Sequence, residues 1–171
     1  GFLAQAMEDV LSGASPAITP EQMNAAISAV QQQTQEKSME KAQAAEQIGQ
    51  DFRQVYRQQE GVSETDSGIL YRVLTPGPGT KPKVDDTVVV HYRGTLVDGT
   101  EFDSSIARGQ PATFSLGGII AGWQESLQLM QEGARWEVVI PPELAYGSTG
   151  AGGAIGPQET LIFEIELIEV K

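Results

Sequence analysis

A chain of 171 residues with 40% hydrophobic content is long enough for one compact domain with an appendage, and it can bury a real core. Its 23 acidic residues outnumber its 11 basic ones, and the net charge of -12 disfavours nucleic acid and anionic membrane surfaces as partners. Cysteine is absent, which excludes disulfides, thiol catalysis and thiolate metal sites.

The start of the chain looks incomplete. It begins at Gly1 rather than Met, and the sequence from Gly1 to Ala4 already resembles the interior of a helix. No stretch approaches the ~20 apolar residues of a membrane span, and no charged and apolar leader is present. We therefore expect a fragment or a processed product, from which a signal peptide could have been lost.

Residues 1–66 are rich in Ala, Gln and Glu and have the pattern of helices. A first helix is predicted near the start, where apolar residues recur at helical spacing before a breaker cluster at residues 12–16. Its apolar positions are Phe2, Leu3, Ala6, Val10 and Leu11.

A second, much longer helix is predicted from Pro20 to Gln59. Thr19 as N-cap, Pro20 at the first helical position and Gln22 as capping-box partner form a strong start signal. At 1.5 Å per residue this helix would be about 60 Å long, so we expect an arm rather than a helix folded back on its own domain. Its apolar ends suit docking to a partner subunit or to the other domain, whereas its Gln-rich middle suits solvent.

Beyond a boundary near residues 61–68, Gly and Pro recur every few residues and strand patterns appear. Five strands are predicted at residues 69–74, 87–97, 112–115, 135–140 and 161–170. The last strand alternates most clearly, since Leu161, Phe163, Ile165 and Leu167 fall on one face.

One short helix is predicted between the third and fourth strands. Ile120, Trp123, Leu127 and Met130 form a single apolar stripe on it. The expected fold class is α+β: residues 67–171 form a five-stranded antiparallel sheet wrapped over this helix, and residues 1–66 form a helical region that contains the long helix.

A set of motifs in this second half resembles the FKBP family of peptidyl-prolyl cis-trans isomerases in order and spacing. The motifs are Val90-His91-Tyr92-Arg93-Gly94-Thr95-Leu96, Asp98-Gly99, Phe102-Asp103-Ser104-Ser105, Gly122-Trp123, Ala145-Tyr146-Gly147 and Thr160-Leu161-Ile162-Phe163. The helical arm and the entry Ser67-Gly68-Ile69-Leu70-Tyr71 are similar to the bacterial macrophage-infectivity-potentiator subgroup, whose members are dimeric isomerases with chaperone activity.

The resemblance implies an FKBP fold and an enzyme that accelerates protein folding without a metal or a cofactor. Its partners would be unfolded or Pro-containing protein clients, macrolide inhibitors of the rapamycin type, and a second copy of the chain bound through residues 1–66. We expect the periplasm or cell envelope as the compartment. The cytoplasm stays as the alternative, because a lack of cysteine fits both compartments.

The resemblance also implies the site residues. Tyr92, Phe102, Trp123 and Phe163 would be the aromatic walls and floor of a pocket, which Ile119, Ile120 and Ile155 complete. Asp103 would contact the substrate region, held by Tyr92 or Arg108, and Tyr146 together with the Ile120 N–H would donate hydrogen bonds to substrate carbonyls. The simpler alternatives are that the four aromatics are core residues and that Asp103 forms a turn. His91 is interpreted as a strand side chain rather than a catalytic base.

Isomerisation needs no nucleophile, because only a rotation barrier of ~18 to 20 kcal/mol must be lowered. An apolar pocket that binds the twisted amide better than the planar one suffices. Two departures from the family bear on inhibitor affinity and on peptide-sequence preference. Ala112 stands where many members have an aromatic, which is expected to open one wall of the pocket, and the glycine-rich loop at residues 148–156 lacks the histidine and Pro-Pro often found there. The competing hypothesis is a non-catalytic chaperone module that only binds Pro-containing segments.

Overall fold

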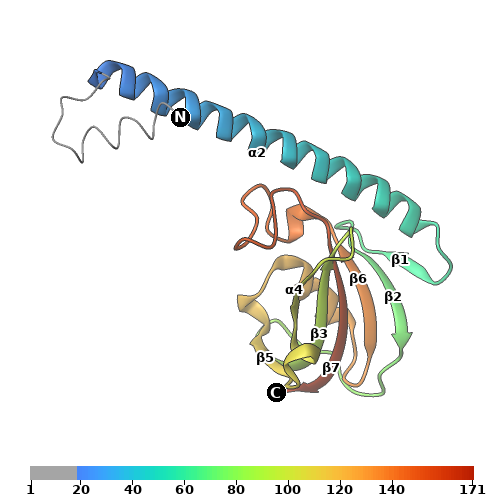
Figure 1. The fold of residues 1–171 in the computed structure, drawn as a ribbon. Helices are drawn as coiled ribbons and strands as arrows, with labels where there is room; N and C mark the ends of the chain where they lie inside the picture. The colour runs from blue at the N-terminus through green and yellow to red at the C-terminus, as the bar shows by residue number, and fades with distance from the viewer. Residues whose placement is uncertain (1–18) are drawn as a thin grey trace. The chain divides into compact units, whose positions relative to one another are not determined.

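The computed structural model describes residues 19–171, and Figure 1 shows the arrangement of their helices and strands. Contacts divide the chain into two compact units, Gly1–Glu40 and Lys41–Lys171. The helix expected near the start of the chain lies outside the described residues, together with the apolar positions that predicted it: Phe2, Leu3, Ala6, Val10 and Leu11.

The long helix is α2, Pro20–Arg57, and its predicted start is confirmed. It has the expected capping box, because the Gln22 amide donates to Thr19 Oγ1 (3.2 Å) and the Thr19 amide donates to Gln22 Oε1 (3.0 Å). The helix ends two residues before the predicted Gln59. There the amides of Gln58 and Gln59 bond to carbonyls three residues back, which closes the last turn.

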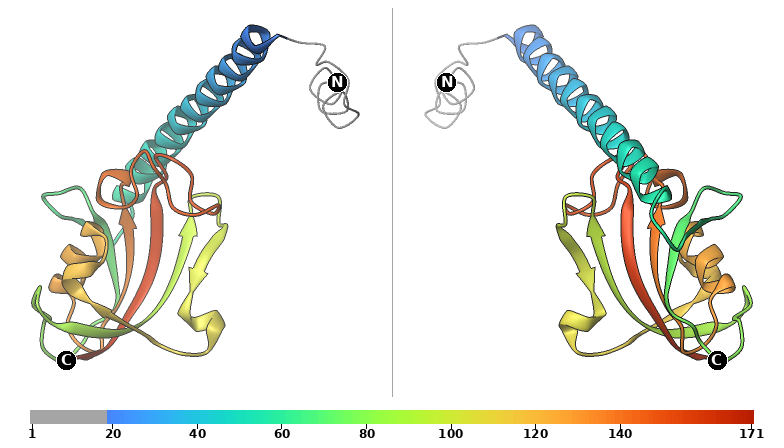
Figure 2. Two further views of the ribbon diagram at one scale, coloured as in Figure 1. Left: turned by 90° about the vertical axis from the view of Figure 1, so that its left-hand side faces the viewer. Right: turned by 90° about the vertical axis from the view of Figure 1, so that its right-hand side faces the viewer.

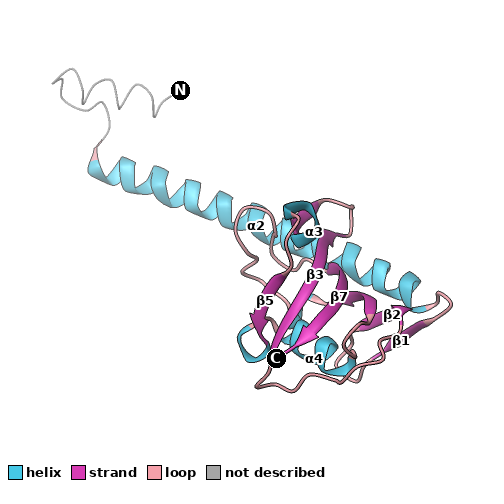
Figure 3. Cartoon of the chain, turned by 90° about the horizontal axis from the view of Figure 1, so that it is seen from below, coloured by secondary structure: helices cyan, strands magenta, loops and turns pink. Residues whose placement is uncertain are grey.

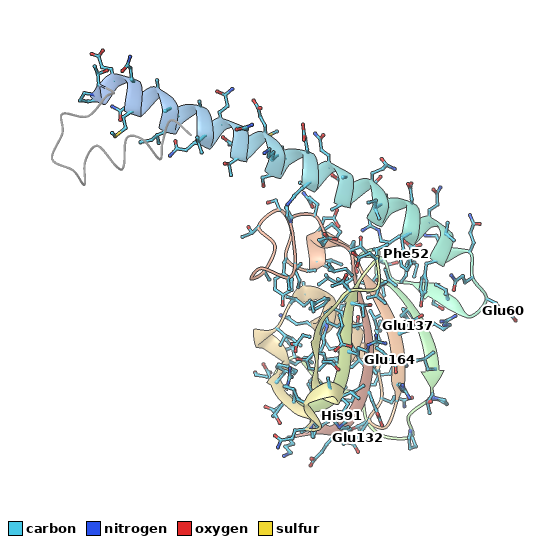
Figure 4. All side chains as sticks on the ribbon, in the orientation of Figure 1. Phe52, Glu60, His91, Glu132, Glu137 and Glu164 are labelled. Carbon is cyan, nitrogen blue, oxygen red and sulfur yellow. The ribbon has the colours of Figure 1, made fainter. Side chains whose placement is uncertain are left out.

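The last turns of α2 pack against the sheet within the second unit. Phe52 and Tyr56 contact Leu70 and Val139 in a small apolar cluster, and the Tyr56 hydroxyl donates to Glu137 at 2.7 Å. Figure 4 labels Phe52 and Glu137 at this contact. The apolar end of α2 therefore docks on the sheet of its own chain. Within the first unit, the described side chains of α2 are almost all exposed.

The sheet is entirely antiparallel and has seven strands. They are β1 (Val62–Glu64), β2 (Leu70–Thr75), β3 (Thr87–Leu96), β4 (Glu101–Ser104), β5 (Ala112–Ser115), β6 (Arg135–Ile140) and β7 (Leu161–Val170). The order is β1-β2-β6-β7-β3-β4, and β5 also pairs with β3. The long strands β3 and β7 lie side by side at its centre (Figure 1).

The sequence predicts five strands, whereas the structure has these five and two more. β1 has three residues and β4 has four, which is too short for alternation to be recognised. β1 is held as an edge strand by β2, and β4 forms a hairpin with β3 through the Asp98-Gly99 turn, where Gly99 has a positive φ of 88°.

Helix α4, Ala121–Leu129, lies against one face of this sheet (Figure 2, Figure 3). Trp123 and Leu127 on α4 and Met130 directly after its end are buried as the apolar stripe predicts, whereas Ile120, before its start, is only partly buried. The buried residues pack against Phe163 and other inward residues of β3, β6 and β7. The other helical segments are α3 (Ser105–Arg108) and the 3-10 turns Leu116–Gly118 and Pro142–Leu144.

No helix in residues 19–171 is both long and apolar enough to cross a membrane. Within the same residues, no group of three or more His, Cys, Asp or Glu side chains is arranged to hold a metal ion.

Candidate active site

A cavity of about 400 Å³ opens between the sheet, helix α4 and the long segment that joins β6 to β7. Most of its lining is apolar and aromatic, which is typical of a site that binds an apolar ligand. The lining residues are Tyr92, Phe102, Asp103, Phe114, Gly118, Ile119, Ile120, Trp123, Tyr146 and Phe163.

Trp123 is the central ring of the cavity. Its indole meets the rings of Tyr92, Phe114 and Phe163 nearly edge-on, with centroid distances of 5.1, 5.5 and 5.1 Å. Phe102 stands edge-on to Phe163 at 5.5 Å. Edge-to-face pairs of this kind fix the orientation of each ring, so the floor and walls of the cavity form one rigid aromatic group. Trp123 is 5% exposed, and its indole N–H has no partner among the described residues.

Gly94 on β3 leaves room for two of these rings. A Cβ at this position would lie 2.5 Å from Phe102 Cζ and 2.8 Å from Phe163 Cε1. Real Cβ atoms essentially never approach so closely. The glycine in the Arg93-Gly94-Thr95 sequence is therefore required by packing, because any side chain there would displace the walls of the cavity.

A hydrogen-bonded group of Tyr92, Asp103 and Arg108 lies beside this apolar cavity, where β4 passes into α3, and its members Tyr92 and Asp103 line the cavity. The Tyr92 hydroxyl donates to Asp103 Oδ2 at 2.5 Å, Arg108 Nη1 donates to Asp103 Oδ1 at 2.5 Å, and Arg108 Nη2 donates to the Tyr92 hydroxyl at 3.0 Å. Arg108 is the last residue of the short helix α3. Ser104 caps the first turn of this helix, and Gly109 ends it with a φ of 73°.

The electrostatics of this group follow from its hydrogen bonds. Burial alone would raise the pKa of Asp103, but hydrogen bonds from Tyr92 and Arg108 and the charge of Arg108 hold it below its ordinary value. Burial and the hydrogen bond to Asp103 raise the pKa of Tyr92, although Arg108 opposes this. Tyr92 is therefore a neutral donor and Asp103 a charged acceptor at neutral pH.

Tyr146 stands at the mouth of the cavity and is 38% exposed. It belongs to residues 141–160, which we call the rim segment because they connect β6 to β7 along the edge of the cavity. Its hydroxyl makes no hydrogen bond to any described residue, and neither does the backbone N–H of Ile120 at the start of α4. Both donors are free to bind a ligand.

Two family models match the chain. The model of the FKBP-type peptidyl-prolyl cis-trans isomerase matches residues 79–168, which include every residue that lines the cavity. The chain belongs to the FKBP-type peptidyl-prolyl cis-trans isomerases. The model of the domain amino terminal to FKBP-type peptidyl-prolyl isomerase matches residues 2–73. The activity of this isomerase is the cis-trans conversion of peptidyl-prolyl bonds, so its substrates are Pro-containing proteins.

Relatives in bacteria confirm the expected subgroup. The isomerase is 42% identical to the FKBP-type 22 kDa peptidyl-prolyl cis-trans isomerase of Escherichia coli, over 98% of this chain and 82% of the relative. It is 44% identical to the outer membrane protein MIP of Legionella longbeachae, over 99% of this chain and 74% of the relative. It is 52% identical to the peptidyl-prolyl cis-trans isomerase Mip of Coxiella burnetii, over 67% of this chain and 50% of the relative.

Solved structures confirm the expected α+β fold. The crystal structure of FkpA from Escherichia coli superposes with a TM-score of 0.83 at 38% identity, over 99% of the isomerase and 80% of that chain. A peptidyl-prolyl cis-trans isomerase from Pseudomonas syringae pv. tomato superposes with a TM-score of 0.71 at 45% identity, over 76% and 96%.

The structure brings most of the predicted site residues of the isomerase together at the cavity. The residues that line it are Asp103, Tyr146, Tyr92, Phe102, Trp123, Phe163, Ile119 and Ile120. Arg108 is not part of the lining and contacts the site through Asp103 and Tyr92. Ile155 is not part of the lining either: it is buried in the core and forms an isolated bridge to Ala151.

Sequence reasoning missed two lining residues, Phe114 and Gly118. A signal for Phe114 exists, because residues two apart on a strand share a face. Phe114 follows Ala112, which was expected to lie at the pocket wall, and both pack against the core. No comparable pattern marks Gly118, which ends a 3-10 turn.

His91 points to the other face of β3, as its neighbour Tyr92 points into the cavity. Its Nδ1 lies 3.1 Å from Ser105 Oγ, and it borders a separate hollow of about 340 Å³ whose other walls include Arg135, Glu164 and Glu166. Figure 4 labels His91 and Glu164. The histidine has no access to the aromatic cavity, in agreement with its interpretation as a strand side chain.

Proposed function

We propose that the aromatic cavity is the catalytic site and that it lowers the rotation barrier by binding the twisted X-Pro amide better than the planar one. The observation that carries this proposal is the convergence of Tyr92, Phe102, Trp123 and Phe163 around one cavity with a single charged acceptor, Asp103. Twisting removes amide resonance and lowers the dipole of the bond. A poorly solvating cavity then penalises the planar amide more than the twisted one, which is differential binding without covalent chemistry.

The proline ring would lie over Trp123, with the chain on either side held by two donors. The Tyr146 hydroxyl and the Ile120 N–H suit this role because neither has a partner among the described residues. Each would donate to a carbonyl of the substrate next to the proline. Fixing the peptide on both sides lets rotation occur at the X-Pro bond alone.

Asp103 would be a charged hydrogen-bond acceptor held in one position at the cavity. Its two oxygens are occupied by Tyr92 and Arg108, so it keeps the Tyr92 ring against Trp123 and faces the substrate with a negative charge. Arg108 acts through these two residues and is a positioning residue for the aromatic wall.

The decisive experiment is cis-trans exchange on an Ala-Leu-Pro-Phe-type peptide. Unaided exchange takes tens to hundreds of seconds. The wild-type chain is expected to accelerate it, and Tyr146→Phe and Asp103→Ala are expected to reduce kcat/KM. If the peptide binds and the wild-type chain fails to accelerate exchange, the chain is a non-catalytic Pro-binding module instead.

We also propose that residues 67–171 carry the isomerase activity and residues 1–66 the assembly. The described apolar side chains Met23, Ile27 and Val30 lie at i, i+4 and i+7 on α2 and are all exposed, which suits contact with a second copy and chaperone activity on unfolded clients. Sedimentation of the chain at micromolar concentrations tests this, and a monomer at all of them would contradict it.

The apolar cavity also suits macrolides of the rapamycin type, which would compete with the peptide. For the compartment we propose the cell envelope, supported by the likeness to an outer membrane protein MIP. Fractionation of cells that express the natural gene tests this, and recovery only in the cytoplasm would contradict it.

A further inference from the structure

The rim segment, which carries Tyr146, is hydrogen-bonded to helix α2 at its C-terminal end. Thr160 is the last residue of the rim segment and is 1% exposed. Arg53 of α2 reaches it across 107 residues of sequence, and Arg53 Nη1 donates to Thr160 Oγ1 at 2.8 Å. Both residues lie in the same compact unit, Lys41–Lys171.

Gly49 allows this approach. A Cβ at position 49 would overlap Thr160 Oγ1 and lie 3.1 Å from Thr160 Cβ. Glycine is disfavoured in the interior of a helix, and Gly49 is buried with α2 continuing for two turns beyond it. The close contact with the rim segment explains why a helix otherwise rich in Ala and Gln has a glycine there.

The N-terminal end of the rim segment affects the pKa of Arg53 through charge. Burial lowers the pKa of the Arg53 guanidinium, and the charges of Glu143 and Glu46 oppose this effect. Glu143 lies in the turn Pro142–Leu144, three residues before Tyr146. The hydrogen bond to Thr160 is therefore the direct contact of Arg53 with the rim segment, and the charge of Glu143 adds only an effect on the pKa of Arg53.

Hydrogen bonds inside the rim segment connect its two ends to Tyr146. The Gln158 amide donates to the Gly147 carbonyl at 2.8 Å, and the Gly147 amide donates to the Pro142 carbonyl at 2.9 Å. Gln158 has a φ of 57°, a backbone conformation that non-glycine residues rarely adopt. The hydrogen bond from Gln158 to Gly147 therefore accompanies an unusual turn of the backbone. These hydrogen bonds connect Gln158, two residues before Thr160, to Gly147, the residue beside Tyr146.

We propose that Arg53 is a positioning residue for Tyr146, so that docking of the last turns of α2 on the sheet and occupation of the aromatic cavity favour each other. The proposal rests on the proposed role of Tyr146 as a substrate donor. Because coupling between two equilibria is reciprocal, a ligand in the cavity must stabilise the docked helix as much as the docked helix strengthens ligand binding.

The kinetic test uses Arg53→Met and Arg53→Lys in the full chain, with exchange of the Ala-Leu-Pro-Phe-type peptide as readout. Arg53→Met is expected to lower kcat/KM about fivefold, the lower end of ordinary coupling between sites, and Arg53→Lys to restore most of it. The matched control is Arg57→Met, because Arg57 lies one turn later on α2 and pairs with Glu64 at 2.6 Å instead of the rim segment. Arg57→Met is expected to leave kcat/KM unchanged.

A double-mutant cycle separates positioning from general destabilisation. If Arg53 acts through Tyr146, then Arg53→Met has no further effect on kcat/KM in the Tyr146→Phe background. Equal losses in both backgrounds would show that Arg53 only stabilises the fold and would overturn the proposal. A wild-type chain without activity would instead contradict the proposed function, so the two failures are distinguishable.

Hydrogen exchange supplies a readout that does not depend on turnover. Saturating peptide is expected to slow amide exchange in residues 49–57 of wild-type α2, and to lose this effect in Arg53→Met while exchange in β3 remains slow. Unchanged exchange of residues 49–57 on peptide binding to the wild type would overturn the coupling.

Discussion

The Tyr92 hydroxyl donates a 2.5 Å hydrogen bond to Asp103 across the neighbouring strands β3 and β4. The bond joins a wall of the cavity to its only charged lining residue. Tyr92 also meets Trp123 edge-on, so the carboxylate is connected to the floor of the cavity through a single side chain. The hydrogen bond to the Asp103 carboxylate therefore adds to the ring contacts that hold the aromatic floor in place, and it is stronger when the acceptor is ionised.

This dependence predicts a simple pH profile. The folded pKa of Asp103 lies below its unfolded value, so its contribution to stability is complete above the unfolded pKa near 4 and is lost as pH falls through the folded pKa. Activity is therefore expected to be independent of Asp103 titration at pH 5 and above. The contribution is small, since the Asp103 side chain is 43% exposed.

The measurement is kcat/KM and the melting temperature between pH 3 and 8 for wild type and Asp103→Asn. Asp103→Asn should lose activity at every pH above 5 and show a smaller loss of stability on acidification than wild type. A midpoint between pH 5 and 7 that disappears in Asp103→Asn would contradict the low pKa.

The two tryptophans predict a spectroscopic test of the site. Trp123 is the centre of the cavity, whereas Trp136 stacks on Tyr71 at 4.6 Å and does not line it. In Trp136→Phe, binding of a macrolide of the rapamycin type is expected to change the fluorescence of the remaining tryptophan. In Trp123→Phe the change should be nearly absent. An equal response of both variants would place the ligand elsewhere.

Gly94→Ala is expected to damage the site through packing alone. The new methyl group would press on Phe102 and Phe163, and overpacking of this kind costs about 1 to 3 kcal/mol of stability. The catalytic loss should exceed the stability loss, because the displaced rings are walls of the cavity. Urea unfolding and kcat/KM measure the two effects.

The matched control is Gly153→Ala, since a Cβ at Gly153 would meet nothing within 4 Å. It should be nearly neutral in both measurements. If Gly94→Ala is equally neutral, the glycine at this position has no packing role.

Local patterns in the sequence predicted much of the fold because they match how these residues are buried. The capping box at Thr19 and Gln22 forms as expected, and Leu161, Phe163, Ile165 and Leu167 are all buried on one face of β7. The strands β1 and β4 have no such pattern, because pairing with a longer neighbour rather than their own composition holds them in the sheet.

The site shows the same division. Motif residues such as Trp123 and Phe102 were expected at the cavity and line it, whereas Ile155 was expected there and is buried in the core instead, which no spacing in the sequence reveals. The contact of Arg53 with Thr160 spans 107 residues. Such pairs depend on how α2 packs on the sheet, so periodicity in one segment cannot predict them.

The small side chain of Ala112, which does not itself line the cavity, predicts a gain of function on substitution. Ala112 on β5 pairs with Val90 on β3, and it lies on the same face as Phe114, which lines the cavity. Ala112→Phe would add apolar surface beside Phe114. Partial burial of a phenyl ring against a ligand contributes about 1 kcal/mol, so affinity for a macrolide of the rapamycin type should rise about fivefold.

The control is Thr113→Phe, because Thr113 is the exposed residue between them and points to the opposite face. Titration of both variants by fluorescence decides the outcome. A similar gain in Thr113→Phe would show that added surface anywhere on β5 suffices. A weaker affinity in Ala112→Phe would show that the wall is already closed by Phe114 and that a second ring obstructs the ligand.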